Sequence, residues 1–246
     1  MADLPYPLTC PRHVRAVDFG HVLVLVDYRT GAVRCLLPAA SLSWRTAART
    51  GRLDQMEPAL ARRLVTLGLL VPSDALTPWA DPVKGEVPQA SWGSAEHSAG
   101  IVCPARTAPT PTVGAAACLS AVFVAGRFGG MRSVVGLLRR AASTCERPAT
   151  PEQALAAVQA VRRAGWYSPG RTACLEESAA ALLLLAARRR AVRWCHGVAP
   201  DPVRLHAWVQ TVDGAHVAEP LATRDCTILL TVGGPSSVPS LIRSCG

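Results

Sequence analysis

The sequence predicts an α+β fold, in which strand patterns and helix patterns occupy separate stretches of the chain. Residues 13–37 hold strand-like runs of valine and leucine, and two helical patterns follow them. After residue 115 the helices come first, and short strands joined by an Asp-Gly turn come after them. Half of the residues are hydrophobic and 17% are charged, which is typical of a globular chain and excludes a disordered one.

Three strands are expected in the stretch HVRAVDFGHVLVLVDYRTGAVRCLL. The Arg-Thr-Gly turn closes a hairpin between the last two strands. In the third strand, the two-residue period places Val33, Cys35 and Leu37 on one face and Arg34 and Leu36 on the other.

Two helices are expected after these strands. Pro38 suits the first turn of the first helix, and Gly51 marks its end. In the second helix Leu60, Leu64 and Leu67 share one face at helical spacing, and Arg63 lies beside them. Strands followed by helices within residues 1–73 predict a small winged-helix-like module.

Residues 74–99 are rich in proline, glycine and serine and lack periodicity, so we interpret them as a linker. The remaining residues, 100–246, are predicted to form an α+β domain. One of its helices is capped by Thr150, and a later one starts near Cys174. Strand patterns follow at residues 191–198, 204–212, 215–220 and 226–232.

Charge and cysteine usage narrow the function classes. The net charge of +9 favours acidic partners, but aromatic residues are only 5% and do not alternate with basic ones, so an acidic peptide is favoured over nucleic acid. The nine cysteines include no CxxC pair and no HxxxH accompanies them, so neither a metal site nor a cofactor is expected.

The start of the chain lacks a signal-peptide pattern, which favours reduced thiols and a cytoplasmic protein. Residues 113–126 are apolar but shorter than the ~20 residues of a membrane span. A buried helix is therefore the favoured interpretation, and a membrane role is not expected.

Cys174 lies where a turn gives way to a long apolar helix, PGRTACLEESAAALLLLAARRRA. Pro169 and Gly170 interrupt the chain, and Thr172 is expected to cap the helix. The free N–H groups and partial positive charge of a helix N-terminus favour a nucleophilic thiolate and stabilise an oxyanion. The alternative is that Cys174 is a small core residue.

His206, on the strand LHAWVQTV, is the candidate base for this thiol, and a hairpin brings Glu219 to its side as the orienting acid. His196 and His216 are rival histidines, but both are expected at surface or edge positions. Cysteine, histidine and acid in this order match papain-like and transglutaminase-like arrangements.

The stretch from Ala173 to Pro220 resembles the cysteine-peptidase domain of the lasso peptide biosynthesis B protein, which has a transglutaminase-like (papain-like) fold. The elements that carry the resemblance are the CLEES helix start, the strand end HGV and the sequence HAWV. The resemblance implies that Cys174 is the nucleophile and His206 the base. Glu219 stands where the family usually has aspartate, so the acid differs in length.

Residues 14–67 are similar to the precursor-peptide recognition element, in which a leader peptide adds as a strand to the third strand and packs on the last helix. This resemblance implies leader contacts at one edge strand and one helix face. The residues are Val33, Arg34, Cys35, Leu36, Leu60, Arg63, Leu64 and Leu67.

Together the resemblances imply a leader peptidase that frees a core peptide for a separate macrolactam synthetase. Two other functions remain open: a transglutaminase-type acyl transferase that passes the acyl group to an amine, and a leader-binding scaffold without catalysis. The precursor leader peptide and the synthetase are the expected partners.

Overall fold

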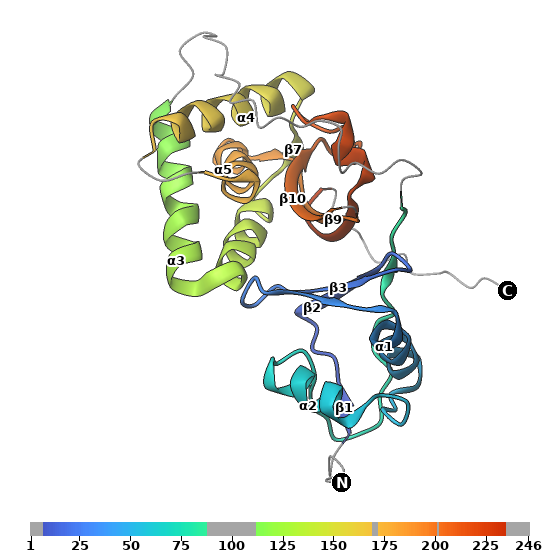
Figure 1. The fold of residues 1–246 in the computed structure, drawn as a ribbon. Coiled ribbons are helices and arrows are strands. Elements are labelled where there is room, and N and C mark those ends of the chain that lie inside the picture. The colour runs from blue at the N-terminus through green and yellow to red at the C-terminus, as the bar shows by residue number, and fades with distance from the viewer. Residues whose placement is uncertain (1–6, 88–111, 169–171, 201, 235–246) are drawn as a thin grey trace, which may run out of the picture.

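The structure is a computed structural model that describes residues 7–87, 112–168, 172–200 and 202–234. Helices and antiparallel sheets lie in separate stretches, so the predicted α+β class is confirmed. A small sheet with two helices forms the N-terminal part, and three helices with a second sheet form the C-terminal part (Figure 1).

The N-terminal sheet contains the three expected strands and a short fourth one, in the order β4-β3-β2-β6. The strands are β2 (Val14–Asp18), β3 (Leu23–Asp27), β4 (Val33–Leu36) and β6 (Val83–Lys84). β6 pairs in parallel with β2, although it comes from the segment interpreted as a linker. The first half of that segment therefore contributes to the sheet, and residues 88–99 lie outside the described residues.

Helices α1 (Pro38–Thr50) and α2 (Pro58–Thr66) cover one face of this sheet. Both start with a proline in the first turn, and Gly51 ends α1 in a left-handed conformation with φ of 70°. Both predicted helices are confirmed. A short ladder between β1 (Leu8–Thr9) and β5 (Val71–Pro72) ties the ends of this part together.

All five residues of β3 are buried, because both faces of the N-terminal sheet are covered. Leu23 and Leu25 pack in the core with α1 and α2, whereas Val24 and Val26 belong to the core of the C-terminal part. Figure 1 shows the sheet lying between the two helices and the rest of the molecule. Packing on both faces explains why the strand is continuously apolar instead of alternating.

The C-terminal part surrounds one apolar helix, α5 (Cys174–Ala186), with α3 (Thr112–Ala142), α4 (Pro151–Trp166) and a sheet of order β10-β9-β11 (Figure 1). The strands are β9 (Arg193–Pro200), β10 (Val203–Gln210) and β11 (Thr227–Gly233). The two-residue strands β7 (Arg147–Pro148) and β8 (Arg190–Ala191) pair in parallel, and β8 follows the C-terminal end of α5. Thr150 is the N-cap of α4, as predicted, and it forms a capping box with Gln153.

α3 is two helical segments joined by a kink at Gly130, where φ is 60°. The kink lies against the β3–β4 turn, and there the N–H of Arg132 donates to the carbonyl of Arg29 at 3.4 Å. By length and composition, α3 is the single helix in the described part of the chain that could cross a membrane. Ala115, Leu119 and Val122 on one side of its first segment are buried in the protein core, whereas Val113, Val124 and Phe128 are exposed, so the predicted buried helix is buried on one side only.

The strand predicted at residues 215–220 is wrong. The Asp-Gly turn before it forms as expected, with Gly214 at φ of 96°, but only one bridge, between Gln210 and His216, follows. Ala218 then takes a positive φ of 55°, which no strand residue adopts, and the chain enters the short helix η1 (Leu221–Asp225).

Candidate active site

Cys174 is the first residue of α5 and is half-buried. Ala173 is the N-cap residue, and its N–H donates to the carboxylate of Glu176 at 3.1 Å. The prediction that Thr172 caps this helix is wrong, because its hydroxyl instead donates to the carboxylate of Glu177 at 2.9 Å. The first helical hydrogen bond starts at the N–H of Glu177, so the earlier N–H groups of the helix are available to a ligand.

Ser178 anchors this first turn to the sheet. Its hydroxyl donates to the carbonyl of Cys174 at 2.6 Å and accepts from the indole N–H of Trp194 on β9 at 2.9 Å. Trp194 is fully buried, so the hydrogen bond between helix and strand is shielded from water. The position of Cys174 relative to the sheet is therefore held by a buried polar contact as well as by packing.

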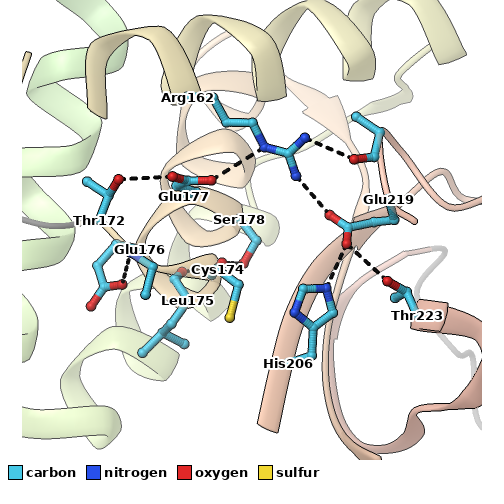
Figure 2. Close-up of polar contacts among 12 residues, drawn as sticks. Arg162, Thr172, Cys174, Leu175, Glu176, Glu177, Ser178, His206, Glu219 and Thr223 are labelled. Atoms are coloured by element: carbon cyan, nitrogen blue, oxygen red, sulfur yellow. Dashed lines mark hydrogen bonds and ion pairs between the residues drawn. The ribbon is translucent and has the colours of Figure 1, made fainter. Parts of the chain in front are cut away.

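His206 on β10 lies beside both Cys174 and Glu219. Its Nε2 is 2.6 Å from Oε2 of Glu219, and its other ring nitrogen faces the Cys174 sulfur (Figure 2). Burial lowers the pKa of His206, but hydrogen bonds and charge attraction from Cys174 and Glu219 outweigh it and raise the pKa to about 9. The site therefore stabilises the imidazolium form.

Trp208 supports the imidazole from the same face of β10, with the two rings stacked at 5.7 Å and 12°. Its indole passes over Gly197, where a Cβ would lie 3.0 Å from the Trp208 ring and 2.6 Å from a carbonyl oxygen of β11. Glycine is thus needed at this position of β9. The prediction that His206 and Trp208 share a face is confirmed.

Glu219 is held in place by contacts from three elements. Its side chain is 5% exposed, and it accepts from Arg162 of α4 at 3.1 Å and from Thr223 of η1 at 3.2 Å. Arg162 also pairs with Glu177 of α5 at 3.4 Å and donates to the carbonyl of Ala218 (Figure 2). The irregular loop therefore brings Glu219 to His206 by these contacts rather than by strand pairing.

Arg162 was missed by the sequence analysis. It is one of two consecutive arginines on an amphipathic helix, and nothing in that pattern separates it from a solvent-facing residue. Only its position across from Glu219 gives it a role.

His196 is buried, with 6% of its surface exposed, so its predicted surface position is wrong. Its Nδ1 lies 2.7 Å from the hydroxyl of Tyr28, which belongs to the N-terminal part. Burial and, to a smaller extent, the charge of His206 lower the pKa of His196 to about 4. His196 is thus neutral near pH 7 and joins the two parts of the chain. His216 is half-buried and packs against Trp208.

A cavity of about 220 Å³ opens beside the candidate nucleophile. Cys174, Leu175, His196 and His206 line it from the C-terminal part, and the N-terminal part also contributes to its wall. The contributing N-terminal residues are Val26 and Gly31. The N-terminal part therefore shapes the space in which a substrate would meet the Cys174 sulfur.

Residues 115–231 match the family model described as the Transglutaminase-like superfamily. These residues form a transglutaminase-like domain. The superfamily includes cysteine peptidases and acyltransferases, and the domain spans all three residues of the candidate triad. No curated protein and no solved structure gives a significant match to the chain.

The predicted leader-contacting residues divide by exposure. β4 is an edge strand, and among the described residues no strand pairs with its outer side. Arg34, Cys35 and Arg63 are exposed, and Val33, Leu60 and Leu67 are half-buried. Leu36 and Leu64 are buried, with 8% and 2% exposed, and belong to the core that α1 and α2 cover. Within the described ranges no group of three His, Cys, Asp or Glu side chains is placed to hold a metal.

Proposed function

We propose that this protein is a leader peptidase of lasso peptide biosynthesis, which binds a precursor peptide and cleaves its leader from the core. The observation that carries the proposal is the contact of Cys174, His206 and Glu219 beside a cavity that both parts of the chain line. The lasso precursor as the substrate class and the synthetase as the partner enter the proposal through the sequence resemblance.

The geometry supports acyl transfer through a thioester. The Cys174 sulfur attacks the scissile carbonyl carbon, and the carbonyl electrons move to oxygen, where the free N–H groups at the start of α5 stabilise the negative charge. As the C–N bond breaks, His206 gives its proton to the leaving amine. Water then attacks the thioester, gives a proton to His206 and releases the leader acid and the Cys174 thiolate.

Glu219 and Arg162 are positioning residues in this scheme. Glu219 fixes the ring of His206 so that Nε2 faces the carboxylate and the other nitrogen faces sulfur. Arg162 neutralises the buried carboxylate and ties it to the helix that carries Cys174. No step requires a metal ion.

The outer edge of β4, which no strand pairs with among the described residues, supports leader docking by strand addition. Gly31, which lines the catalytic cavity, is two residues before Val33, and this distance is about 7 Å along an extended chain. The leader is the N-terminal part of a precursor, so its C-terminal end must approach Gly31. An added leader strand therefore runs antiparallel to β4, with its last residues entering the cavity.

A second function, acyl transfer to an amine, is favoured by the match to a superfamily that includes acyltransferases. The same thioester would then be opened by an amine instead of water. The mass of the product distinguishes the two reactions, because hydrolysis leaves a free carboxylic acid on the leader.

The test incubates full-length protein with a synthetic precursor peptide and reads the products by mass spectrometry. We expect the wild type and the control Cys145→Ala to release leader acid and core amine, and Cys174→Ala and His206→Ala to release neither. Cys145 is also half-buried but lies at the end of α3, away from the cavity. Cleavage that survives Cys174→Ala would refute the catalytic assignment.

Leader docking is tested separately with Arg34→Glu. We expect weaker leader binding by fluorescence anisotropy and an unchanged melting temperature, because Arg34 is exposed on the free edge. Leader bound by a protein that cleaves under no condition would favour the scaffold function.

A further inference from the structure

A second and larger cavity, of about 580 Å³, lies between the N-terminal sheet and the C-terminal part. The β2 and β3 side of the sheet forms one wall, and the second segment of α3 with Leu230 of β11 forms the other. Its lining is strongly basic. The arginines in it are Arg12, Arg15, Arg29, Arg132 and Arg139, and all five are exposed.

None of these five arginines forms an ion pair with an acidic residue in the described part of the chain. Other arginines of the protein do have acidic partners, such as Arg45 with Asp18 and Arg189 with Glu146. Five like charges in one concave space repel each other and raise the local potential. An anionic ligand would relieve that repulsion.

The spacing of the arginines favours an extended ligand over a compact one. Arg132 and Arg139 are seven residues apart on α3, which separates them by about 10 Å, and Arg12 and Arg15 face them from the other wall. Compact phosphates are usually held by converging backbone N–H groups at a helix start or a glycine-rich loop. Arg132 lies in the first turn of the second α3 segment, but its backbone N–H already donates to the carbonyl of Arg29, and Val135, Gly136 and Arg139 lie farther along that segment.

Tyr28 connects this cavity with the catalytic one. Its side chain lines the arginine cavity, and its hydroxyl contacts His196, which lines the catalytic cavity. The two cavities therefore adjoin at this buried pair. The guanidinium group of arginine binds a carboxylate with two parallel hydrogen bonds. Acidic side chains spaced along a peptide could therefore pair with the arginines that line this cavity.

We propose that the arginine cavity binds acidic residues of the peptide substrate and so selects acidic peptides for cleavage. The inference rests on the proposed peptidase function for its biological meaning. Its binding step is independent of catalysis and is tested in full-length protein that carries Cys174→Ala.

The probe is a fluorescein-labelled peptide with four repeats of Glu-Gly-Gly, compared with the same peptide carrying Gln in place of Glu. We expect fluorescence anisotropy to show salt-sensitive binding of the Glu peptide, at least tenfold tighter than that of the Gln peptide. The double variant Arg132→Glu/Arg139→Glu should weaken binding at least tenfold. The matched control Arg140→Glu/Arg188→Glu makes the same change in net charge at exposed positions outside the cavity and should change affinity less than threefold.

Equal weakening by both double variants would overturn the proposal, because it would show attraction by overall charge alone. Binding of inorganic pyrophosphate in calorimetry, with no binding of the Glu peptide, would also overturn it in favour of a phosphate site. Circular dichroism checks the fold of each variant, and Arg132→Gln/Arg139→Gln repeats the test with a milder change. If the binding results hold but the wild type cleaves no precursor, the proposed peptidase function fails and the acidic-peptide site stands.

Discussion

The carboxylate of Glu219 is expected to control the alkaline limit of catalysis. The pKa of His206 rises from 6.5 to about 9, and the two groups that raise it are Cys174 and Glu219. This rise corresponds to roughly 3 kcal/mol in favour of the imidazolium. Glu219 raises this pKa both as a hydrogen-bond partner and through its charge, and an effect of about one pKa unit on loss of the charge corresponds to about a tenfold change in the protonation equilibrium.

The sign of the pH dependence follows from which form reacts. His206 must carry a proton to deliver it to the leaving amine, so kcat/KM should fall as pH rises through about 9. Glu219→Gln keeps the size of the side chain but removes its charge. We expect this change to move the alkaline fall of the kcat/KM profile to lower pH by about one unit. We also expect it to lower kcat at pH 7 by roughly ten- to a hundredfold.

The assay is a pH series of peptide cleavage between pH 5 and 10, with Asp225→Asn of η1 as a charge-matched control that should keep the wild-type profile. An alkaline limb at the same pH in wild type and Glu219→Gln would show that Glu219 does not raise the pKa of His206. The same linkage affects folding: a raised His206 pKa stabilises the fold fully below pH 6.5 and loses that contribution as pH rises through about 9. In urea unfolding, Glu219→Gln should therefore lower the free energy of unfolding less at pH 10 than at pH 6.

Three further changes test the parts that hold the site. Ser178→Ala leaves the buried indole N–H of Trp194 without its partner and should lower the free energy of unfolding by about 1–3 kcal/mol in urea, whereas Ser178→Thr should lose less. Gly197→Ala puts a Cβ 2.6 Å from a carbonyl of β11 and should cost about 1–3 kcal/mol by the same measurement; a neutral result would contradict the packing of β9. Tyr28→Phe removes the hydroxyl that contacts His196, so it should lower the free energy of unfolding by about 1–2 kcal/mol and slow peptide cleavage. An unchanged cleavage rate would show that this contact between the two parts is not needed for catalysis.

Much of the local structure could be predicted because its signals are local. Pro38 and Gly51 bound α1, and Thr150 caps the start of α4, as expected. The strand period placed His206 and Trp208 on one face, and they stack there. Each of these features depends on backbone preferences within a few residues.

Two local predictions failed because specific side-chain contacts prevailed over backbone preferences. Residues 215–220 have the composition of a strand, but Arg162 and Thr223 hold Glu219 in an irregular loop instead. Thr172 is a favourable cap residue by type, yet its hydroxyl is engaged by Glu177. In both cases a specific side-chain contact outweighed an intrinsic preference.

From the amino-acid sequence we could predict that a helix starts near Cys174 and that a histidine strand and an acid follow it in order. We could not predict that β3 is covered on both faces, that Tyr28 reaches His196 across 168 positions of the chain, or that five arginines share one cavity. The physical reason is the range of the forces that act. Helix starts and strand faces follow from neighbouring residues, whereas burial and charge clustering depend on how distant elements pack.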